Sequence, residues 1–421
     1  MPAHPKVVTL DGFIGLDNRH RPEDTILKFL KEAENIDIST SGGIAKRKGY
    51  TKVLSGDVTS LWSSNNGLGC YAVVNGDLVR VLDNYSLVTI KEAAGKDKFS
   101  FTEVDDHIYF VSKSNKGAIY NGKLVPWGFP KNNISPTITT SIGTLLSGTY
   151  QVSFTYVGEN GVESGAGIPS VITIPGNKNL NISIPNPGIN GVQYARVYCS
   201  TPDGTVLYYI GRAELNSTFT ISDISTKRPF RLFNVDEPPT GHLIAYYNGR
   251  LYIAQDNILW YSEPFQYHHF DLGYNYIEFQ EEIRNVLPVE GGVWVSSDKI
   301  YYLSGDTPNE FKRVTKEDVK AVPGTETKIS GSYLHIDNTP VGYKWLITTD
   351  VGIFVLFNQG LIINLTAENI DLDKASKGSS ILLKANGNVQ YLTILRKEDK
   401  PSNTSVGDLV EATIVRNGVN I

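Results

Sequence analysis

The stretch from Tyr246 to Ser262 reads YYNGRLYIAQDNILWYS, and it decides the fold. Asn248-Gly249 supplies two residues that tolerate a positive φ angle, as a type I′ hairpin turn requires. The mostly apolar Arg250–Ala254 predicts a strand, Asp256-Asn257 predicts a second turn, and Ile258–Tyr261 predicts a second strand. One hairpin cannot bury enough surface to be stable alone. We therefore expect further copies of it.

The same order of turn, strand, turn and strand recurs in degenerate form. Four further segments show it: Cys70–Val81, Asp105–Gly122, Gly291–Leu303 and Lys344–Leu356. With the opening hairpin included, the aromatic residue of the first strand is Tyr71, Tyr109, Tyr252, Trp294 and Trp345, with gaps of 38, 143, 42 and 51 residues. Three gaps match the roughly 40–50 residues of a four-stranded propeller blade, and the long gap equals one blade plus about 100 inserted residues. The repeat predicts an all-β chain, a β-propeller of about six blades with one insertion.

The insertion has a strand pattern of its own. Tyr150, Val152, Phe154 and Tyr156 alternate with polar or small residues, and further strand patterns follow at Leu180–Ile184, Ala195–Cys199, Leu207–Ile210 and Thr218–Ile221. Half-buried strands at this spacing predict an immunoglobulin- or fibronectin-III-like β-sandwich. We assign residues 57–133 to the first part of the propeller, 134–236 to the sandwich and 237–421 to the second part of the propeller.

Residues 1–56 predict a strand, a short helix and a hairpin arm that join the propeller. The strand is Val7–Leu10, and we expect a late strand to pair with it and close the ring of blades. The helix begins near Arg21, because a proline and two acidic residues suit a first helical turn. Ile26, Leu27, Leu30 and Ala33 would lie on its apolar face, and it would end near Asn35.

The hairpin arm follows, with Ile36–Ile38 as its first strand. Its charged residues predict a solvated arm, and the sharper alternative is a contact with a neighbouring subunit or with phosphate. The residues of this possible docking element are Ser41, Gly42, Gly43, Lys46, Arg47 and Lys48.

The same region carries a family resemblance. Phe13–Asn18 reads FIGLDN, Glu32–Ile38 reads EAENIDI, Gly42-Gly43 follows, and Arg47–Tyr50 reads RKGY. In this order they resemble the opening of tail-hub or nozzle proteins of short-tailed bacteriophages, of the packaged-DNA stabilisation type. Asp17 before Asn18, and Glu34 before Asn35, depart from that family's pattern. Each piece is common, while their order is distinctive.

The resemblance implies a virion structural protein of the phage tail, assembled in the host cytoplasm. Such a protein forms a ring, a homo-hexamer, below the portal and its adaptor, and it meets tail fibre, spike or needle proteins. It retains the packaged DNA and then serves as the exit channel for genome ejection. The net charge of −5 argues against a basic nucleic-acid-binding surface. We expect DNA to pass through without sequence-specific binding.

No constellation in the sequence predicts catalysis, a cofactor or a metal site. The candidate pairs are His268-His269, Glu281-Glu282 and Asp105-Asp106. Neighbours on a strand point to opposite faces, which is poor geometry for a shared ion or proton. Cys70 and Cys199 lie in apolar patterns typical of buried thiols, not of a disulfide. No secretory signal and no apolar run long enough for a membrane span is visible.

Two other classes of function stay open. One is a propeller-type glycosidase or a carbohydrate-binding tail fibre module, which would need a carboxylate-lined pocket on the propeller axis. The other is a bacterial surface adhesion protein, which normally begins with a signal peptide.

Overall fold

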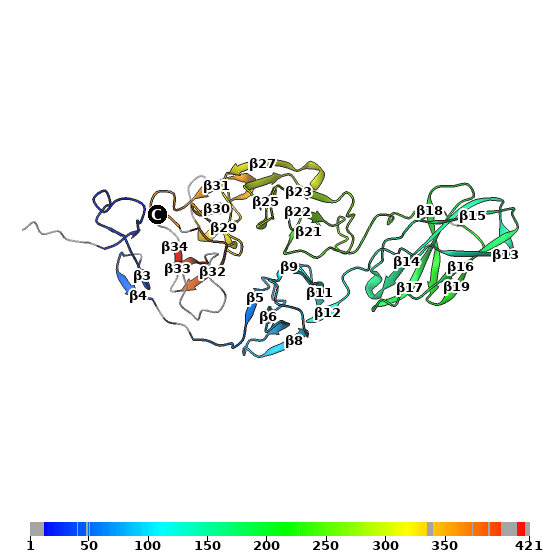
Figure 1. Ribbon diagram of the computed structural model, residues 1–421, viewed down its shortest axis with the longest axis horizontal. Helices are drawn as coiled ribbons and strands as arrows, with labels where there is room; N and C mark the ends of the chain where they lie inside the picture. The colour runs from blue at the N-terminus through cyan, green and yellow to red at the C-terminus, as the bar shows by residue number, and fades with distance from the viewer. Residues whose placement is uncertain are drawn as a thin grey trace, which may run out of the picture. The chain divides into compact units, whose positions relative to one another are not determined.

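The computed structural model describes residues 12–39, 41–47, 49, 51–224, 226, 228–334, 340–372, 374–385, 388–396 and 411–416. These residues form strands and four 3₁₀-helices, with no α-helix among them (Figure 1). The 3₁₀-helices are η1 (Glu159–Gly161), η2 (Pro308–Glu310), η3 (Gly331–Tyr333) and η4 (Asn358–Gly360). The predicted all-β class is confirmed.

The chain divides into two compact units. The middle unit is Gly56–Glu278, and the terminal unit combines Met1–Ser55 with Phe279–Ile421. Each unit contains three sheets of one kind, in which every strand pairs antiparallel with the next one along the chain. Such a meander is the blade of a β-propeller. The described residues thus form six blades.

The middle unit holds the first three blades. The first blade is β5 (Val58–Ser63), β6 (Cys70–Val74), β7 (Asp77–Val81) and β8 (Leu87–Lys91). The second blade is β9 (Ser100–Val104), β10 (His107–Val111), β11 (Lys116–Tyr120) and β12 (Lys123–Val125). The third blade is β20 (Leu243–Tyr247), β21 (Arg250–Gln255), β22 (Ile258–Tyr261) and β23 (Tyr276–Glu278).

The terminal unit holds the other three blades. The fourth blade is β24 (Asn285–Val289), β25 (Gly292–Ser296), β26 (Ile300–Ser304) and β27 (Lys312–Glu317). The fifth blade is β28 (Thr327–Ser330), β29 (Tyr343–Thr349), β30 (Gly352–Leu356) and β31 (Ile362–Asn364). The sixth sheet has three strands in the described residues: β32 (Lys377–Ala385), β33 (Asn388–Arg396) and β34 (Glu411–Arg416).

Turn chemistry sets the hairpins of these blades. Asn75 and Gly76 have φ of 54° and 93°, and Asn248 and Gly249 have φ of 43° and 76°. Both pairs are therefore in the left-handed region that a type I′ turn requires. The turn at Asn248-Gly249 joins β20 to β21, and the aromatic Tyr252 on β21 is almost fully buried. The predicted hairpin at the restart of the propeller is confirmed.

Neighbouring blades pack through apolar faces. Between the first and second blades, Trp62 stacks on Phe101 with ring centroids 5.6 Å apart. Between the fourth and fifth blades, the buried indole of Trp294 donates a hydrogen bond to the carbonyl oxygen of Phe357, 2.8 Å away. Tyr391 in β33 packs in one core with the fifth blade, and its hydroxyl donates to the carbonyl of Thr325. Face-to-face packing of successive sheets is what a propeller requires.

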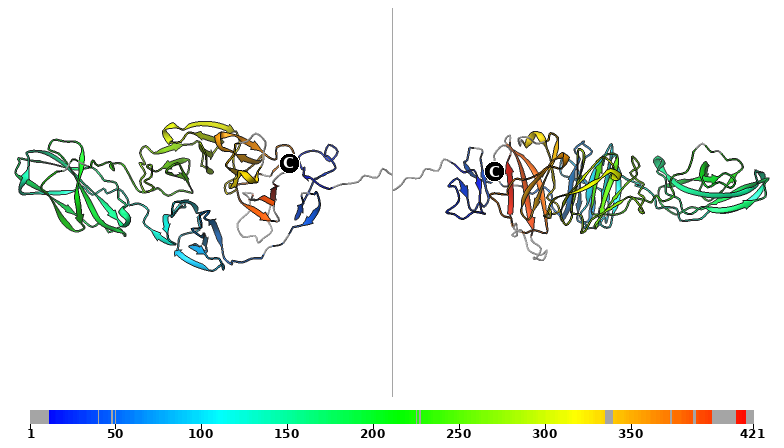
Figure 2. Two further views of the ribbon diagram at one scale, coloured as in Figure 1. Left: turned by 180° about the vertical axis from the view of Figure 1, so that it is seen from behind. Right: turned by 90° about the horizontal axis from the view of Figure 1, so that it is seen from above.

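The sandwich separates the second and third blades in the sequence. One sheet is β13 (Thr137–Leu145), β16 (Lys178–Ile184) and β19 (Ser217–Ile221). The other is β15 (Ser170–Ile174), β14 (Gly148–Gly158), β17 (Val192–Ser200) and β18 (Leu207–Glu214). The alternating residues predicted to face inward are buried in the core between the two sheets: Tyr150, Val152, Phe154 and Tyr156. These strands can be followed in Figure 2 by their green colours.

Within the middle unit, the sandwich contacts the return segment and the loop between β22 and β23 of the third blade. Ala166 donates its amide hydrogen to the carbonyl of Leu232 on the return segment. A Cβ on Gly165 would lie only 1.8 Å from the carbonyl oxygen of Val235. The Nε2 atom of His269 lies 2.7 Å from the carbonyl oxygen of Glu163. The approach is so close that only glycine fits at position 165.

One predicted element is wrong. Residues Arg21–Asn35 form no helix; successive turns lead into the two-residue strand β2 (Phe29–Leu30). Ile26 and Leu27, expected on a buried helix face, are each 66% exposed. A short amphipathic helix is stable only when its apolar face packs against another element. Here backbone pairing of β2 holds the segment instead. The predicted pairing of Val7–Leu10 with a late strand lies outside the described residues.

Candidate docking sites

The described residues between 12 and 47 form an element that we call the N-terminal clasp. It contains β1 (Gly15–Leu16), which pairs parallel with β2, and the hairpin of β3 (Ile36–Ile38) and β4 (Ile44–Lys46). Gly15 lies opposite Phe29, and a Cβ on Gly15 would lie 3.3 Å from the Phe29 ring. The described residues of the N-terminal signature thus belong to one local structure.

Asn18 fastens the clasp to the connection that follows the fifth blade. Its side-chain amide donates to the carbonyl of Asp371 over 3.0 Å, and its Oδ1 accepts the amide hydrogen of Asp371 over 2.8 Å. The amide of Asn18 also donates to the carbonyl of Asn369. Asn18 therefore pairs with backbone as another strand would, which gives the asparagine of the signature a structural role.

Asp17, which departs from the family's pattern, stabilises the next turn. Its carboxylate is almost fully buried and accepts the backbone amides of Arg19 and His20. Burial works to raise the pKa of Asp17, but the hydrogen bonds from His20 and the charge of Lys31 lower this pKa below its usual value. A carboxylate with several donors is held in its ionised form.

The predicted docking hairpin is present, but its tip is not free. Gly42, at the turn, is buried, and its carbonyl accepts the amide hydrogen of Phe13 over 2.8 Å. Its φ is +82°, and a Cβ there would lie 2.9 Å from the Phe13 nitrogen. Ser41, Gly43 and Lys46 are exposed, and Arg47 is half-buried. Lys48 lies outside the described residues.

The clasp exposes large apolar side chains. Ile14 is 46% exposed, Ile26 and Leu27 are 66% exposed, and Ile44 is 44% exposed. These four residues belong to one small element, and exposed apolar surface is one mark of an interaction site. Sequence reasoning missed this surface because it placed Ile26 and Leu27 on a buried helix face.

A second candidate site is a cleft between the first and second blades, which we call the Arg80 cleft. Its volume is about 300 Å³, and Tyr71, Arg80, Asp106 and Ile108 are among its lining residues. A wider hollow of about 640 Å³ shares Arg80 and adds the β7–β8 turn. Sequence reasoning missed it, because a single arginine within a strand pattern gives no signal.

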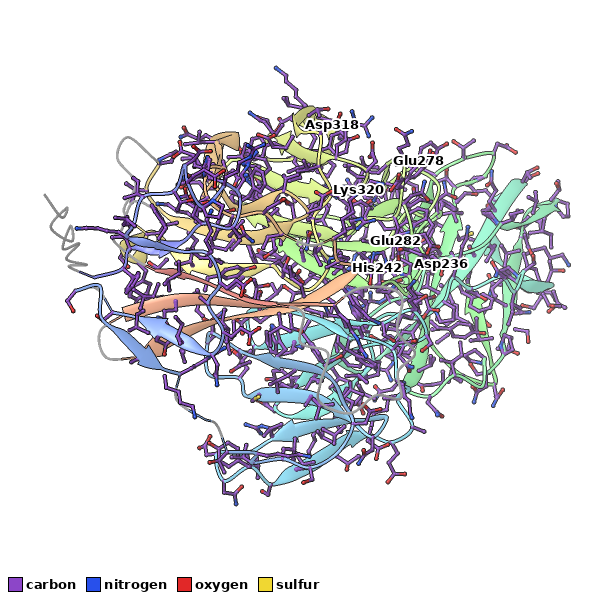
Figure 3. All side chains as sticks on the ribbon, turned by 60° about the vertical axis from the view of Figure 1, so that its left-hand side comes forward. Asp236, His242, Glu278, Glu282, Asp318 and Lys320 are labelled. Atoms are coloured by element: carbon purple, nitrogen blue, oxygen red, sulfur yellow. The ribbon has the colours of Figure 1, made fainter. Side chains whose placement is uncertain are left out.

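Of the residue pairs considered for catalysis, Asp105-Asp106 borders the Arg80 cleft, because Asp106 lines it. Glu281 accepts hydrogen bonds from the ammonium group of Lys320 over 2.7 and 2.8 Å. Lys320 and the second residue of this pair, Glu282, are labelled in Figure 3. Asp105 and Asp106 are both exposed in the β9–β10 turn.

The histidine pair is a packing element of the sandwich junction. His269 is buried; its Nδ1 lies 2.7 Å from Oε1 of Gln266, and its Nε2 contacts the Glu163 carbonyl. Both ring nitrogens are thus occupied. Burial lowers the pKa of His269 and lowers that of His268 to about 3. In the described part of the chain, no group of three His, Cys, Asp or Glu residues is placed to hold a metal ion.

Cys199 is buried and Cys70 is half-buried, and both are free thiols. Burial raises the pKa of the Cys199 thiol to about 12 and raises that of Cys70. A thiol with a raised pKa is a poor nucleophile at neutral pH. As for membranes, none of the helices among the described residues has the length and apolar composition to cross one.

Comparisons with known proteins show only distant likeness. No protein-family model matches the chain, and no curated protein matches it. Among solved structures, BBS1N in complex with ARL6DN shares 8% identity over 82% of this chain and 91% of that one, with a TM-score of 0.33. KlHsv2 with an altered loop shares 9% identity over 82% and 90%, with a TM-score of 0.28. The AfRom2 CNH domain shares 12% identity over 79% and 88%, with a TM-score of 0.22. At these values the likenesses carry no argument about function.

Proposed function

We propose that this chain is a structural protein of a short-tailed phage virion, a subunit of the tail hub or nozzle. It assembles as a ring that retains packaged DNA and later lets the genome leave. Its work is assembly and gating and not catalysis. The observation that carries the proposal is the N-terminal clasp, in which the signature residues fasten themselves to the propeller while apolar side chains stay exposed.

Each half of that observation supports a docking role. Asn18 and Gly42 hold the clasp through backbone hydrogen bonds, so its shape does not depend on a partner. Ile26, Leu27 and Ile44 contribute little to the core of the chain, because much of each side chain faces solvent. A preorganised element with exposed apolar residues is the kind of surface that gains most from association.

The partners follow from the same proposal. The first is the chain itself, in a homo-hexameric ring. The others are the portal or adaptor protein above the ring and tail fibre, spike or needle proteins. DNA passes through without base-specific contacts. The propeller and the sandwich then serve as scaffolds that space the docking elements, which is a common use of rigid β architectures.

The alternative of a propeller-type glycosidase or carbohydrate-binding fibre module has less support. Glycosidases act through two carboxylates that face each other across the bond. The Arg80 cleft has a single carboxylate in its lining, Asp106, and the wider hollow also has one, Asp83. Neither supplies the acid and the base or nucleophile that hydrolysis needs.

A mass measurement on the purified full chain tests the proposal. Six chains of 46.4 kDa have a mass of about 278 kDa, which native mass spectrometry and sedimentation velocity resolve readily from the monomer. We expect a ring, alone or after addition of the adaptor from the same virus, with particle images showing six-fold symmetry. A chain that stays monomeric with the adaptor and hydrolyses a glycan would refute it.

A further inference from the structure

Arg80 stands in a cross-strand row on one face of the first blade. In register, Trp62 lies opposite Tyr71, Tyr71 opposite Arg80, and Arg80 opposite Val88. Directly opposed residues share a face. Trp62 and Tyr71 pack in one core with residues of the second blade, whereas Arg80 is half-buried and Val88 is 46% exposed. The row thus passes from core to cleft to solvent.

The guanidinium of Arg80 has room around it and no partner of its own. A Cβ on Gly69 would lie 3.0 Å from Nε, and a Cβ on Gly122 would lie 3.0 Å from Nη1, so glycine at both positions leaves space. The side chain of Arg80 forms no hydrogen bond or ion pair with the described residues, and Asp106 lines the cleft without pairing to it. An arginine is always charged and presents five donors suited to a carboxylate.

On the side of the wider hollow, the rim of the cleft is the β7–β8 turn, whose Leu82, Asp83 and Asn84 line that hollow. Leu82 is 37% exposed and Tyr85 is 54% exposed. Tyr85 has φ of +63°, a conformation that bulky residues seldom adopt. The turn is closed by hydrogen bonds from the Leu82 amide to the Ser86 carbonyl and from the Tyr85 amide to the Leu82 carbonyl. Strain that the structure maintains at an exposed aromatic residue is typical of binding sites.

The clasp carries the complementary chemistry in one short loop. Glu23 and Asp24 are exposed acids, and Ile26 and Leu27 are the exposed apolar residues that follow them. The loop is ordered by its own hydrogen bonds, from the Asp24 amide to the Arg21 carbonyl and from the Phe29 amide to the Ile26 carbonyl. A carboxylate beside two aliphatic side chains matches a guanidinium beside a leucine and a tyrosine.

We propose that the loop Glu23–Leu27 of one copy of this chain docks in the Arg80 cleft of a second copy. A carboxylate of Glu23 or Asp24 accepts hydrogen bonds from Arg80, and Ile26 and Leu27 cover the rim. Such a contact joins two different surfaces, and contacts of that kind generate closed rings when the rotation between copies closes. The identification of the partner as a second copy rests on the ring proposed above.

Sedimentation velocity of the full chain across a concentration series tests this contact. Arg80→Ala removes the cation. We expect it to weaken association of the chain by about 30-fold or more, as truncation of one partner of a charge pair in an interface does. Arg231→Ala is the matched control, because Arg231 is an exposed arginine of the same unit. The loop variant Ile26→Ser/Leu27→Ser alters only exposed side chains and should weaken association comparably while the melting temperature stays unchanged.

A charge exchange sharpens the test. Arg80→Glu alone, and Glu23→Arg/Asp24→Arg alone, should each prevent association. An equimolar mixture of the two variants should restore it, because the loop of each variant then meets an oppositely charged residue 80 in the other. If the wild-type chain assembles and all these variants assemble equally well, this contact is wrong and the ring proposal stands. If the wild-type chain stays monomeric at every concentration, both alone and with the adaptor, both are wrong.

Discussion

Acid should weaken the junction between the sandwich and the third blade through His268 and His269. Burial lowers the pKa of His268 from 6.5 to about 3, and the nearby His269 adds to this effect. Burial also lowers the pKa of His269, although its contact with the Glu163 carbonyl and the charges of Glu163 and Glu263 oppose this. The folded state therefore binds these protons less readily than the unfolded chain does.

The direction and the size of this pH effect on the unfolding free energy follow from the linkage between proton binding and folding. The stabilisation is complete above pH 6.5 and is lost progressively as the pH falls from 6.5 toward 3, because only the unfolded chain takes up the proton in that window. A pH of 5 lies about 1.5 units below the pKa of His268 in the unfolded chain. Protonation of the unfolded chain therefore lowers the unfolding free energy by about 2 kcal/mol relative to neutral pH. Partial exposure of the His268 ring reduces the expected loss to about 1–2 kcal/mol.

Urea unfolding at pH 7.5 and pH 5.0, followed by tryptophan fluorescence, measures the loss. Trp127 is a suitable reporter, because its indole donates a hydrogen bond to the carbonyl of Tyr267, next to His268. Carboxylates also titrate in this range, so the comparison is with His268→Gln, which cannot take up the proton. The wild type should lose about 1–2 kcal/mol more than His268→Gln between the two pH values. An equal pH dependence of the two proteins would show that His268 is protonated as easily in the fold as outside it.

Three further predictions concern packing and the clasp. Trp294→Ala should lower the unfolding free energy by about 3–5 kcal/mol, because it leaves a large cavity and removes the hydrogen bond to the Phe357 carbonyl. Chemical denaturation measures this loss, and a loss below about 1 kcal/mol would contradict a core role for Trp294. Glu163→Ala should lower the unfolding free energy by about 3–5 kcal/mol. The carboxylate accepts hydrogen bonds from Thr155, Tyr198 and Arg196, and its loss leaves that arginine unpaired in a largely buried site. An unchanged melting temperature would contradict this prediction. Asn18→Ala should leave global stability nearly unchanged but speed amide hydrogen exchange in β1 and β2, and unchanged exchange would show that the Asp371 contact does not hold the clasp.

The blades could be predicted because their information is local. The turn Asn248-Gly249 and the alternation at Tyr150–Tyr156 act over a few residues, and both appear in the structure as expected. Burial of a single residue is less local: Trp260, in β22, is only half-buried and donates its indole hydrogen to Gln255. A strand pattern predicts which face a side chain takes but not how far the neighbouring blade covers it.

The clasp shows where local signals fail. Proline, two acids and an apolar face predict a helix at Arg21–Asn35, yet parallel pairing of β1 with β2 and the bonds of Asn18 to Asp371 hold that segment as turns. Asn18 and Asp371 are 353 residues apart in the chain, so no window of sequence contains both. The weak helical preference of a short segment does not compete with contacts of that range.

The sequence by itself determined the order of strands and turns and the position of the insertion, because each depends on residues near one another in the chain. Only the tertiary structure decided that Ile26 and Leu27 face solvent and that Arg80 lies unpaired in a cleft. Exposure and pairing are properties of what packs around a side chain. The two candidate docking sites therefore became visible only once distant segments were brought together.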